Sequence, residues 1–188
     1  MTRFKHEELS FGFVILLPEF NPGALQGTMR SIRNRYPKDF PVVCVTGKDT
    51  TAAELKEIKE YCPAHRGKHT ITSLINTGMK KGNKAWNIII MAGAVVRPSL
   101  DQRYSYWIES EKDVLYPIVV DYNRDGYPVK IYAEFYEATL NGLCMHHKTF
   151  KSVGDLSNDV FEWSRKIWAL DAAKQGVKFK AILGTKMC

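Results

Sequence analysis

Apolar and polar positions divide the first half of the chain into alternating strands and helices. Nearly continuous apolar runs cover residues 11–17, 42–45 and 86–91, and turn-forming residues bound each run. Such runs are typical of strands that are buried on both faces of a sheet. A further strand is predicted around Thr70, just before the segment that contains Asn76.

Helical periodicity fills the segments between these strands. Residues 25–32 place apolar side chains on one face at helical spacing. Thr50 or Thr51 can cap the next helix, and Glu54 completes a capping box with Thr51. A third helix contains Asn76. Strands joined by helices through short connections predict a parallel sheet with right-handed crossovers.

Ligands of such sheets bind beyond the carboxyl ends of the strands. This rule alone places a candidate cleft at three short segments of the chain. They are Pro18-Glu19, Thr46-Gly47 and Ala92-Gly93-Ala94.

The pattern changes after Pro98. It predicts, in order, a helix from 98 to about 109, strands over 115–120, 129–132 and 139–145, a long helix from 157 or 159 to 175, and an edge or return strand over 177–183. Asn-Arg-Asp-Gly at 123–126 is a strong turn signal, and Gly176 is a natural helix stop. No linker or repeat divides the chain, so one α/β domain over residues 1–188, with a mostly parallel central sheet flanked by helices, is predicted.

Composition narrows the class of protein. The 188 residues are 45% hydrophobic and 25% charged, as in an ordinary globular domain. No stretch approaches the roughly 18 apolar residues of a membrane helix, and the N-terminus lacks the apolar core of a signal peptide. A cytoplasmic protein without an integral membrane segment is therefore expected. The four cysteines show no Cys-x-x-Cys spacing, and Cys44 and Cys144 are expected to be reduced core residues.

The net charge of +7 favours an anionic partner such as a nucleoside diphosphate, an anionic polymer or a membrane surface. A basic surface that keeps the protein soluble also explains this charge, and on charge alone we favour that explanation. No basic stripe interleaved with aromatic residues is present, so nucleic-acid binding is not indicated.

Several segments together resemble the family 2, type A glycosyltransferases. Residues 13–21, Phe-Val-Ile-Leu-Leu-Pro-Glu-Phe-Asn, resemble the opening strand of that family and the Pro-Thr-Tyr-Asn at its end. Residues 42–46 resemble the second strand of the family, and Asn76-Thr77-Gly78 resemble its helix near the donor. Residues 141–154 resemble its acceptor-side strand, the Arg/Lys-x-x-Phe that follows this strand in the family, and Val-Gly. The resemblance implies a Rossmann-like nucleotide-binding half over residues 11–98 and an acceptor-side half over residues 99–188.

The chain departs from the family pattern at its reactive positions. Ala92 and Ala94 stand where the resemblance places the Asp-x-Asp that holds the metal of a nucleotide-sugar, and Thr46 stands for the Asp that contacts the donor base. Ser164-Arg165 falls where the last helix usually carries Glu-Asp. Alanine supplies no metal ligand, so no metal site and no cofactor are expected. A metal-independent transferase would neutralise the leaving diphosphate with Lys or Arg, and Arg97, Lys80 and Lys84 are nearby in sequence.

The resemblance implies two groups of site residues. The donor-binding group is Pro18, Glu19, Asn21, Thr46, Asn76, Ala92, Ala94 and Arg97, and the candidate catalytic acids are Asp155, Asp159 and Glu162. Helix capping explains these acids equally well, because Asp and Glu stabilise the first turn of a helix. His146 and His147 would point to opposite faces of a strand, which argues against a shared metal ion.

Two functions follow from these patterns. The first is transfer of a sugar from a nucleotide-sugar donor to an unknown acceptor, by an enzyme that is metal-independent or weakly active. The second is a pseudoenzyme, a catalytically lapsed protein of the glycosyltransferase fold that acts as a binding or assembly module. The missing carboxylates favour the second function, whereas the retained framework keeps the first one open.

Overall fold

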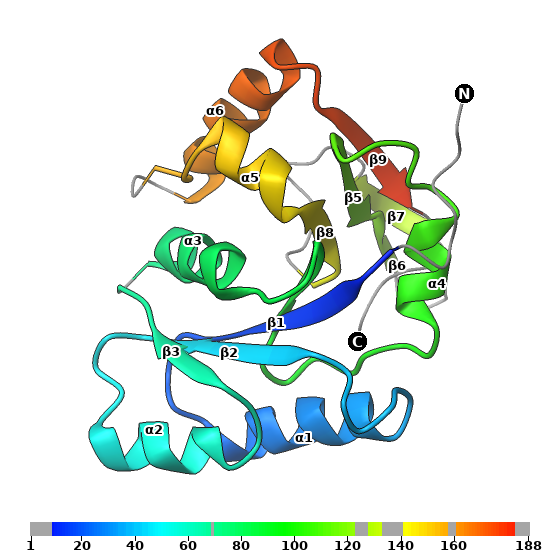
Figure 1. Cartoon of the computed structure of the whole chain (residues 1–188). Coiled ribbons are helices and arrows are strands. Elements are labelled where there is room, and N and C mark those ends of the chain that lie inside the picture. Colours follow the sequence, from blue (N-terminus) through cyan, green and yellow to red (C-terminus); the bar gives the residue numbers. More distant parts are fainter. Residues whose placement is uncertain (1–8, 69, 123–127, 133–140, 158–160, 183–188) are drawn as a thin grey trace.

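Seven strands form the central sheet of the protein, and their order is β3-β2-β1-β4-β8-β5-β9. The computed structural model describes residues 9–68, 70–122, 128–132, 141–157 and 161–182 (Figure 1). The strands are β1 (Phe11–Leu17), β2 (Val42–Thr46), β3 (Ala64–Arg66), β4 (Trp86–Met91), β5 (Asp113–Pro117), β8 (Leu143–His146) and β9 (Lys178–Ile182). β1 to β4 are parallel, β8 is antiparallel to β4 and β5, and β9 is parallel to β5. The predicted α/β domain with a mostly parallel sheet is confirmed.

Helices cover both faces of this sheet. They are α1 (Pro22–Arg33), α2 (Ala52–Lys59), α3 (Ile71–Lys81), α4 (Leu100–Ser105), α5 (His147–Val153) and α6 (Phe161–Lys174). α1 and α2 lie on one face, whereas α3, α5 and α6 lie on the other (Figure 1). Phe13 and Ile15 of β1 pack in the same cluster as Leu25 of α1, and Val14 and Leu16 pack in the cluster of α3. The apolar run of β1 is therefore buried on both sides, as predicted.

Polar caps determine where the helices begin. The predicted capping box of α2 is confirmed, with Thr51 and Glu54 bonding each other's main chain. Thr70 caps α3, because its hydroxyl accepts a hydrogen bond of 3.2 Å from the amide of Ser73. The strand predicted around Thr70 is therefore wrong, and β3 lies earlier in the chain. β3 has three residues, of which only Ala64 is buried, so it carries almost no apolar pattern.

The second half of the chain differs more from its prediction. The helix predicted from 98 to about 109 is the shorter α4. The strand predicted over 115–120 is divided between β5, which ends at Pro117, and β6 (Val119–Tyr122), which belongs to a separate sheet. α5 was not predicted at all, since it follows β8 directly and no turn residue marks its start. β9 is confirmed as an edge strand, and Gly176, at φ 78°, follows the end of α6 as expected.

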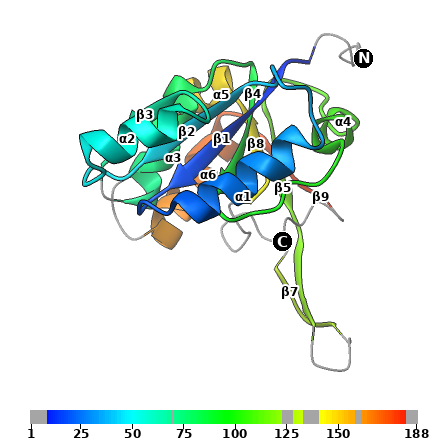
Figure 2. The ribbon, with the colours of Figure 1, turned by 90° about the horizontal axis from the view of Figure 1, so that it is seen from below.

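β6 pairs in an antiparallel manner with β7 (Pro128–Tyr132). Figure 2 shows β7 extending away from the seven-stranded sheet. The turn predicted at 123–126, and the start of the strand predicted over 139–145, lie outside the described residues. Cys44, Cys62 and Cys144 are buried and free, as expected for reduced core cysteines. No helix in the described ranges combines the length and the apolar character that a membrane span requires.

Candidate functional site

The register of the parallel strands brings three of the predicted donor-binding segments to one edge of the sheet. Leu17 pairs with Thr46, and Leu16 pairs with Met91, so the residues that follow β1, β2 and β4 lie together. The amide of Gly47 donates to the carbonyl of Leu17 at 3.2 Å. A Cβ atom on Gly47 would lie 2.3 Å from the carbonyl oxygen of Pro18, so the two loops touch and only glycine fits there.

Some side chains at this edge form hydrogen bonds with the protein's own main chain. Thr46 is fully buried, and its hydroxyl donates to the carbonyl of Gly47 at 3.3 Å. Asn21 is exposed, and its side-chain oxygen caps α1 by accepting from the amide of Ala24 at 3.0 Å. Glu19 is exposed. Pro18, Glu19 and Asn21 therefore form the accessible rim of the edge, whereas the Thr46 side chain lies beneath it.

The turn after β4 contains Ala92, Gly93 and Ala94 and is bound to α1. Gly93 has a φ of 96°, and its amide donates to the hydroxyl of Thr28 at 2.9 Å. The same hydroxyl donates to the carbonyl of Ala94 at 3.0 Å, and Thr28 is fully buried. The two alanine side chains carry no oxygen or nitrogen, so the side chains of this turn do not fit a divalent cation.

From this turn the chain runs beside the second half of α1 and past its end. Its main chain bonds in turn to the hydroxyl of Ser31, the guanidinium of Arg35 and the hydroxyl of Tyr36. The Tyr36 hydroxyl lies 3.4 Å from the carbonyl oxygen of Arg97 and accepts from the amide of Leu100 at 2.8 Å. Burial, reinforced by the charge of Asp101, raises the pKa of Tyr36 far above its ordinary value, so the phenol keeps the proton that it donates.

The path of this loop determines where the main chain of Arg97, another predicted donor-binding residue, lies. Gly93 and Ala94 bond to Thr28, in the middle of α1, whereas the carbonyl oxygen of Arg97 lies against the hydroxyl of Tyr36, which follows the end of that helix. That Arg97 shares one pocket with Thr46 and the segment 18–21 stays a prediction.

Asn76 is buried on α3 and is tied to a distant segment. Its side-chain amide donates to the carbonyl of Leu156 at 2.8 Å, and its oxygen accepts from the amide of Leu156 at 2.9 Å. Both hydrogen-bonding groups of the side chain are thus used by the main chain that follows α5. That Asn76 contacts a nucleotide-sugar stays a prediction. Such a contact requires either that the hydrogen bonds to Leu156 break or that the amide uses its remaining hydrogen-bonding capacity.

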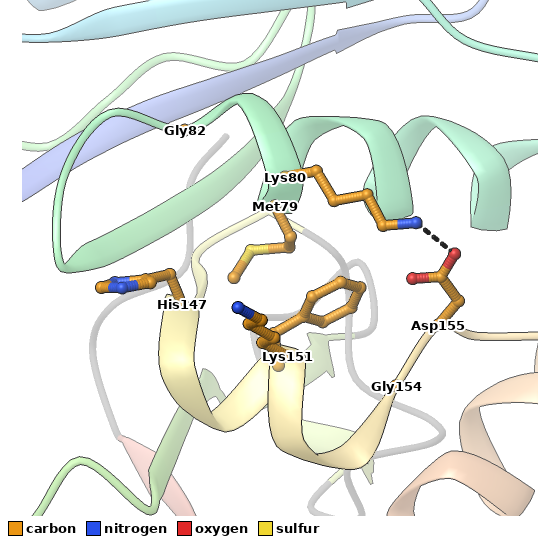
Figure 3. A pocket seen from close by; sticks show the side chains of 8 residues that line it. Met79, Lys80, Gly82, His147, Lys151, Gly154 and Asp155 are labelled. Atoms are coloured by element: carbon orange, nitrogen blue, oxygen red, sulfur yellow. Dashed lines mark hydrogen bonds and ion pairs between the residues drawn. The ribbon is translucent and has the colours of Figure 1, made fainter.

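Asp155, one of the three candidate acids, forms an ion pair of 2.5 Å with Lys80. Both side chains are about half exposed and lie at the mouth of a pocket between α3 and α5 (Figure 3). None of the predicted donor-binding residues lines this pocket. Asp159 and the side chain of Glu162 lie outside the described part of the chain. Arg165, which stands where the resemblance expects an acid, is buried.

The same pocket contains residues that sequence patterns did not suggest. It has a volume of about 360 Å³, and its lining residues are Met79, Lys80, Gly82, His147, Phe150, Lys151, Gly154 and Asp155. Several of them lie on α5, the helix that was not predicted. Lys148 and Phe150 were noticed only for their resemblance to the Arg/Lys-x-x-Phe of the family, and a helical spacing between His147 and Lys151 was the one signal available.

His146 and His147 were expected to point to opposite faces of a strand, and this expectation is wrong. Their rings are stacked, with centroids 4.7 Å apart, because His147 begins α5 instead of continuing β8. Nδ1 of His146 accepts from the amide of Lys148 at 3.2 Å. Burial lowers the pKa of His146 to about 4, against the opposing charge of Glu111. Within the described ranges, no group of three or more His, Cys, Asp or Glu side chains could hold a metal ion.

Comparison with known proteins identifies the fold. No protein-family model matches the sequence, and no curated protein sequence matches it. Among solved structures, the mannosyltransferase PcManGT from Pyrobaculum calidifontis, in complex with GDP-Man and Mn²⁺, matches with a TM-score of 0.66 and 12% identity over 95% of this chain and 56% of that chain. S. aureus TarS 1-349, in complex with UDP-GlcNAc, matches with a TM-score of 0.66 and 12% identity over 95% and 57% of the two chains.

GalNAc-T7, with UDP, GalNAc and Mn²⁺, matches with a TM-score of 0.65 and 13% identity over 93% of this chain and 42% of that chain. The chain thus spans roughly half the length of the proteins it resembles. At such low identity the likeness concerns the arrangement of helices and strands. The chain has the type A glycosyltransferase fold.

Proposed function

We propose that this chain is a catalytically lapsed protein of the type A glycosyltransferase fold, which acts as a binding or assembly module. One observation carries the proposal. The turn after β4 offers only the alanine side chains of Ala92 and Ala94, and the Thr28 hydroxyl bonds its main chain on both sides of Gly93.

The charge of a nucleotide-sugar explains why this turn matters. PcManGT holds Mn²⁺ with GDP-Man, and GalNAc-T7 holds Mn²⁺ with UDP. A divalent cation offsets the charge of the leaving diphosphate, and oxygen ligands must hold it in place. In this chain the turn lacks side-chain oxygens, and the Ala94 carbonyl already accepts a hydrogen bond. The candidate catalytic acid Asp155 is likewise already engaged, because its carboxylate forms an ion pair with Lys80.

Metal-independent sugar transfer is the alternative function, and one observation favours it. The carboxyl ends of β1, β2 and β4 still form a common edge with an exposed rim at Glu19 and Asn21. Lys48 and Arg66, which follow β2 and end β3, are exposed as well. Such cations could offset a diphosphate without a metal ion.

Calorimetric titration of the purified protein with UDP-GlcNAc and GDP-mannose, with and without Mn²⁺, tests the proposal. The same mixtures should be assayed for released nucleoside diphosphate. We expect that Mn²⁺ strengthens neither binding isotherm and that no saturable turnover occurs. Saturable turnover that disappears in Asp159→Asn or Glu162→Gln, with Lys56→Ala as a control on the distant α2, would establish the transferase instead.

A further inference from the structure

The pocket between α3 and α5 has no place in the function proposed above. Its volume of about 360 Å³ lies within the range of roughly 300–1,000 Å³ that is usual for small-molecule sites. Figure 3 shows α3 on one side, α5 on the other, and the side chain of Met79 between them. Phe150 of α5 also lines the pocket. The pocket lies on the α3 face of the sheet and shares no residue with the strand-end edge.

The floor of the pocket is apolar. Met79 and Phe150 are each 3% exposed, so they belong to the core while contributing to the pocket wall. A methionine thioether is flexible and polarizable, and it makes favourable contacts with aromatic rings. Phe150 supplies an aromatic surface from the opposite helix. This floor suits a flat, apolar group such as an aromatic ring.

Positive and negative charges do not cancel at the mouth of the pocket. At one end, Lys80 and Asp155 neutralise each other in their ion pair. Nδ1 of His147, on the first turn of α5, lies 3.3 Å from the carbonyl oxygen of Ala85. The ammonium of Lys151 extends over the floor (Figure 3), and it forms no hydrogen bond or ion pair with the residues that the structure describes. Lys151 therefore leaves one uncompensated positive charge beside the apolar floor.

We propose that this pocket binds a small aromatic anion, whose ring packs on Met79 and Phe150 and whose carboxylate, sulfonate or phosphate group contacts Lys151. A cation would be repelled by the Lys151 ammonium. A neutral aromatic molecule would use the floor without using this charge. The proposal is independent of whether the strand-end edge binds a nucleotide-sugar.

A pair of dyes with the same ring system tests the site. The probe is 1-anilinonaphthalene-8-sulfonate, an aromatic anion, and the matched neutral probe is N-phenyl-1-naphthylamine. Binding is followed by fluorescence and by the methyl resonances of the methionines, with Met79 assigned through Met79→Leu. We expect the anion to shift the Met79 methyl resonance and to bind more tightly than the neutral probe. Its affinity should fall as ionic strength rises.

Exposed lysines on two helices provide matched variants. Lys151→Ala should weaken binding of the anion about threefold to tenfold, as expected for the loss of a charge-assisted contact. It should leave the neutral probe unaffected. Lys56→Ala, which removes an exposed lysine from α2, should change neither affinity.

Three results would overturn the proposal. The first is fluorescence enhancement without a shift at Met79, which would place the dye elsewhere on the protein. The second is equal affinity for the anionic and the neutral probe. The third is an equal loss of affinity in Lys151→Ala and Lys56→Ala. The salt dependence and the Met79 shift are measured on the unaltered protein, so they decide the matter even if a variant fails to fold.

Discussion

The buried hydroxyl of Thr28 donates a hydrogen bond of 3.0 Å to the carbonyl oxygen of Ala94, 66 residues away in the sequence. It also accepts a hydrogen bond of 2.9 Å from the amide of Gly93. One side chain of α1 thus holds both sides of the turn after β4. The shape of this turn is therefore supported by a side chain of α1.

Thr28→Val should therefore destabilise the protein without altering the shape of the side chain. The substitution leaves the buried carbonyl of Ala94 without this partner, and an unsatisfied buried polar group costs about 1–3 kcal/mol. Urea denaturation measures the change in the free energy of unfolding. Thr28→Ser, which keeps the hydroxyl, should lose clearly less, and equal losses in the two variants would contradict the assigned role.

Ala94→Asp should be costly, whereas Ala92→Asp should be tolerated. Ala94 is 4% exposed, so a carboxylate there would be buried without a partner, at a cost of several kcal/mol. Ala92 is half-buried at the rim, and we expect a change within about 1 kcal/mol there. Denaturation with and without Mn²⁺ and UDP checks both variants. If the double variant were stabilised by Mn²⁺ with UDP, the turn would be able to accept the metal after all.

Asn76→Ala should release the segment that follows α5. It removes both hydrogen bonds to the main chain of Leu156, and we expect a loss of about 2–4 kcal/mol in the free energy of unfolding. Hydrogen exchange at the Leu156 amide should become faster. Asn83→Ala, at an exposed position just after α3, serves as the control and should leave both quantities unchanged.

Stability should fall as the pH is lowered from about 6.5 toward 4. In this window the unfolded chain protonates His146, whereas the folded protein, with the pKa of His146 lowered to about 4, does not. The unfolded state then binds more protons, so the free energy of unfolding decreases by up to about 3 kcal/mol. Glu111 opposes this shift, and His147 and Lys148 reinforce it.

Denaturation at pH 7.5 and pH 5 measures this dependence. His146→Asn keeps a side chain that can cap α5 but does not titrate, so it should lose less stability between the two values. The Glu111 carboxylate has a lowered pKa, and its own contribution is lost only at still lower pH. An identical loss in the unaltered protein and in His146→Asn would assign the pH dependence to other groups.

The sequence by itself determined the parallel half of the fold. The apolar runs of β1, β2 and β4 indicate strands that are buried on both faces, and the pair Thr51 and Glu54 indicates where α2 begins. These signals are local, because a buried strand or a helix cap needs only a few neighbouring residues of the right chemistry. The same patterns also identified the edge where Pro18, Thr46 and Ala92 meet.

Only the tertiary structure decided how the candidate groups are used. Asn76 is bonded to Leu156, Asp155 is paired with Lys80, and the carbonyl oxygen of Arg97 lies against the hydroxyl of Tyr36. Each of these contacts joins segments more than 60 residues apart, and none produces a periodic pattern in the sequence. The pocket between α3 and α5 arises in the same way, because it exists only where two helices distant in sequence pack side by side on one face of the sheet.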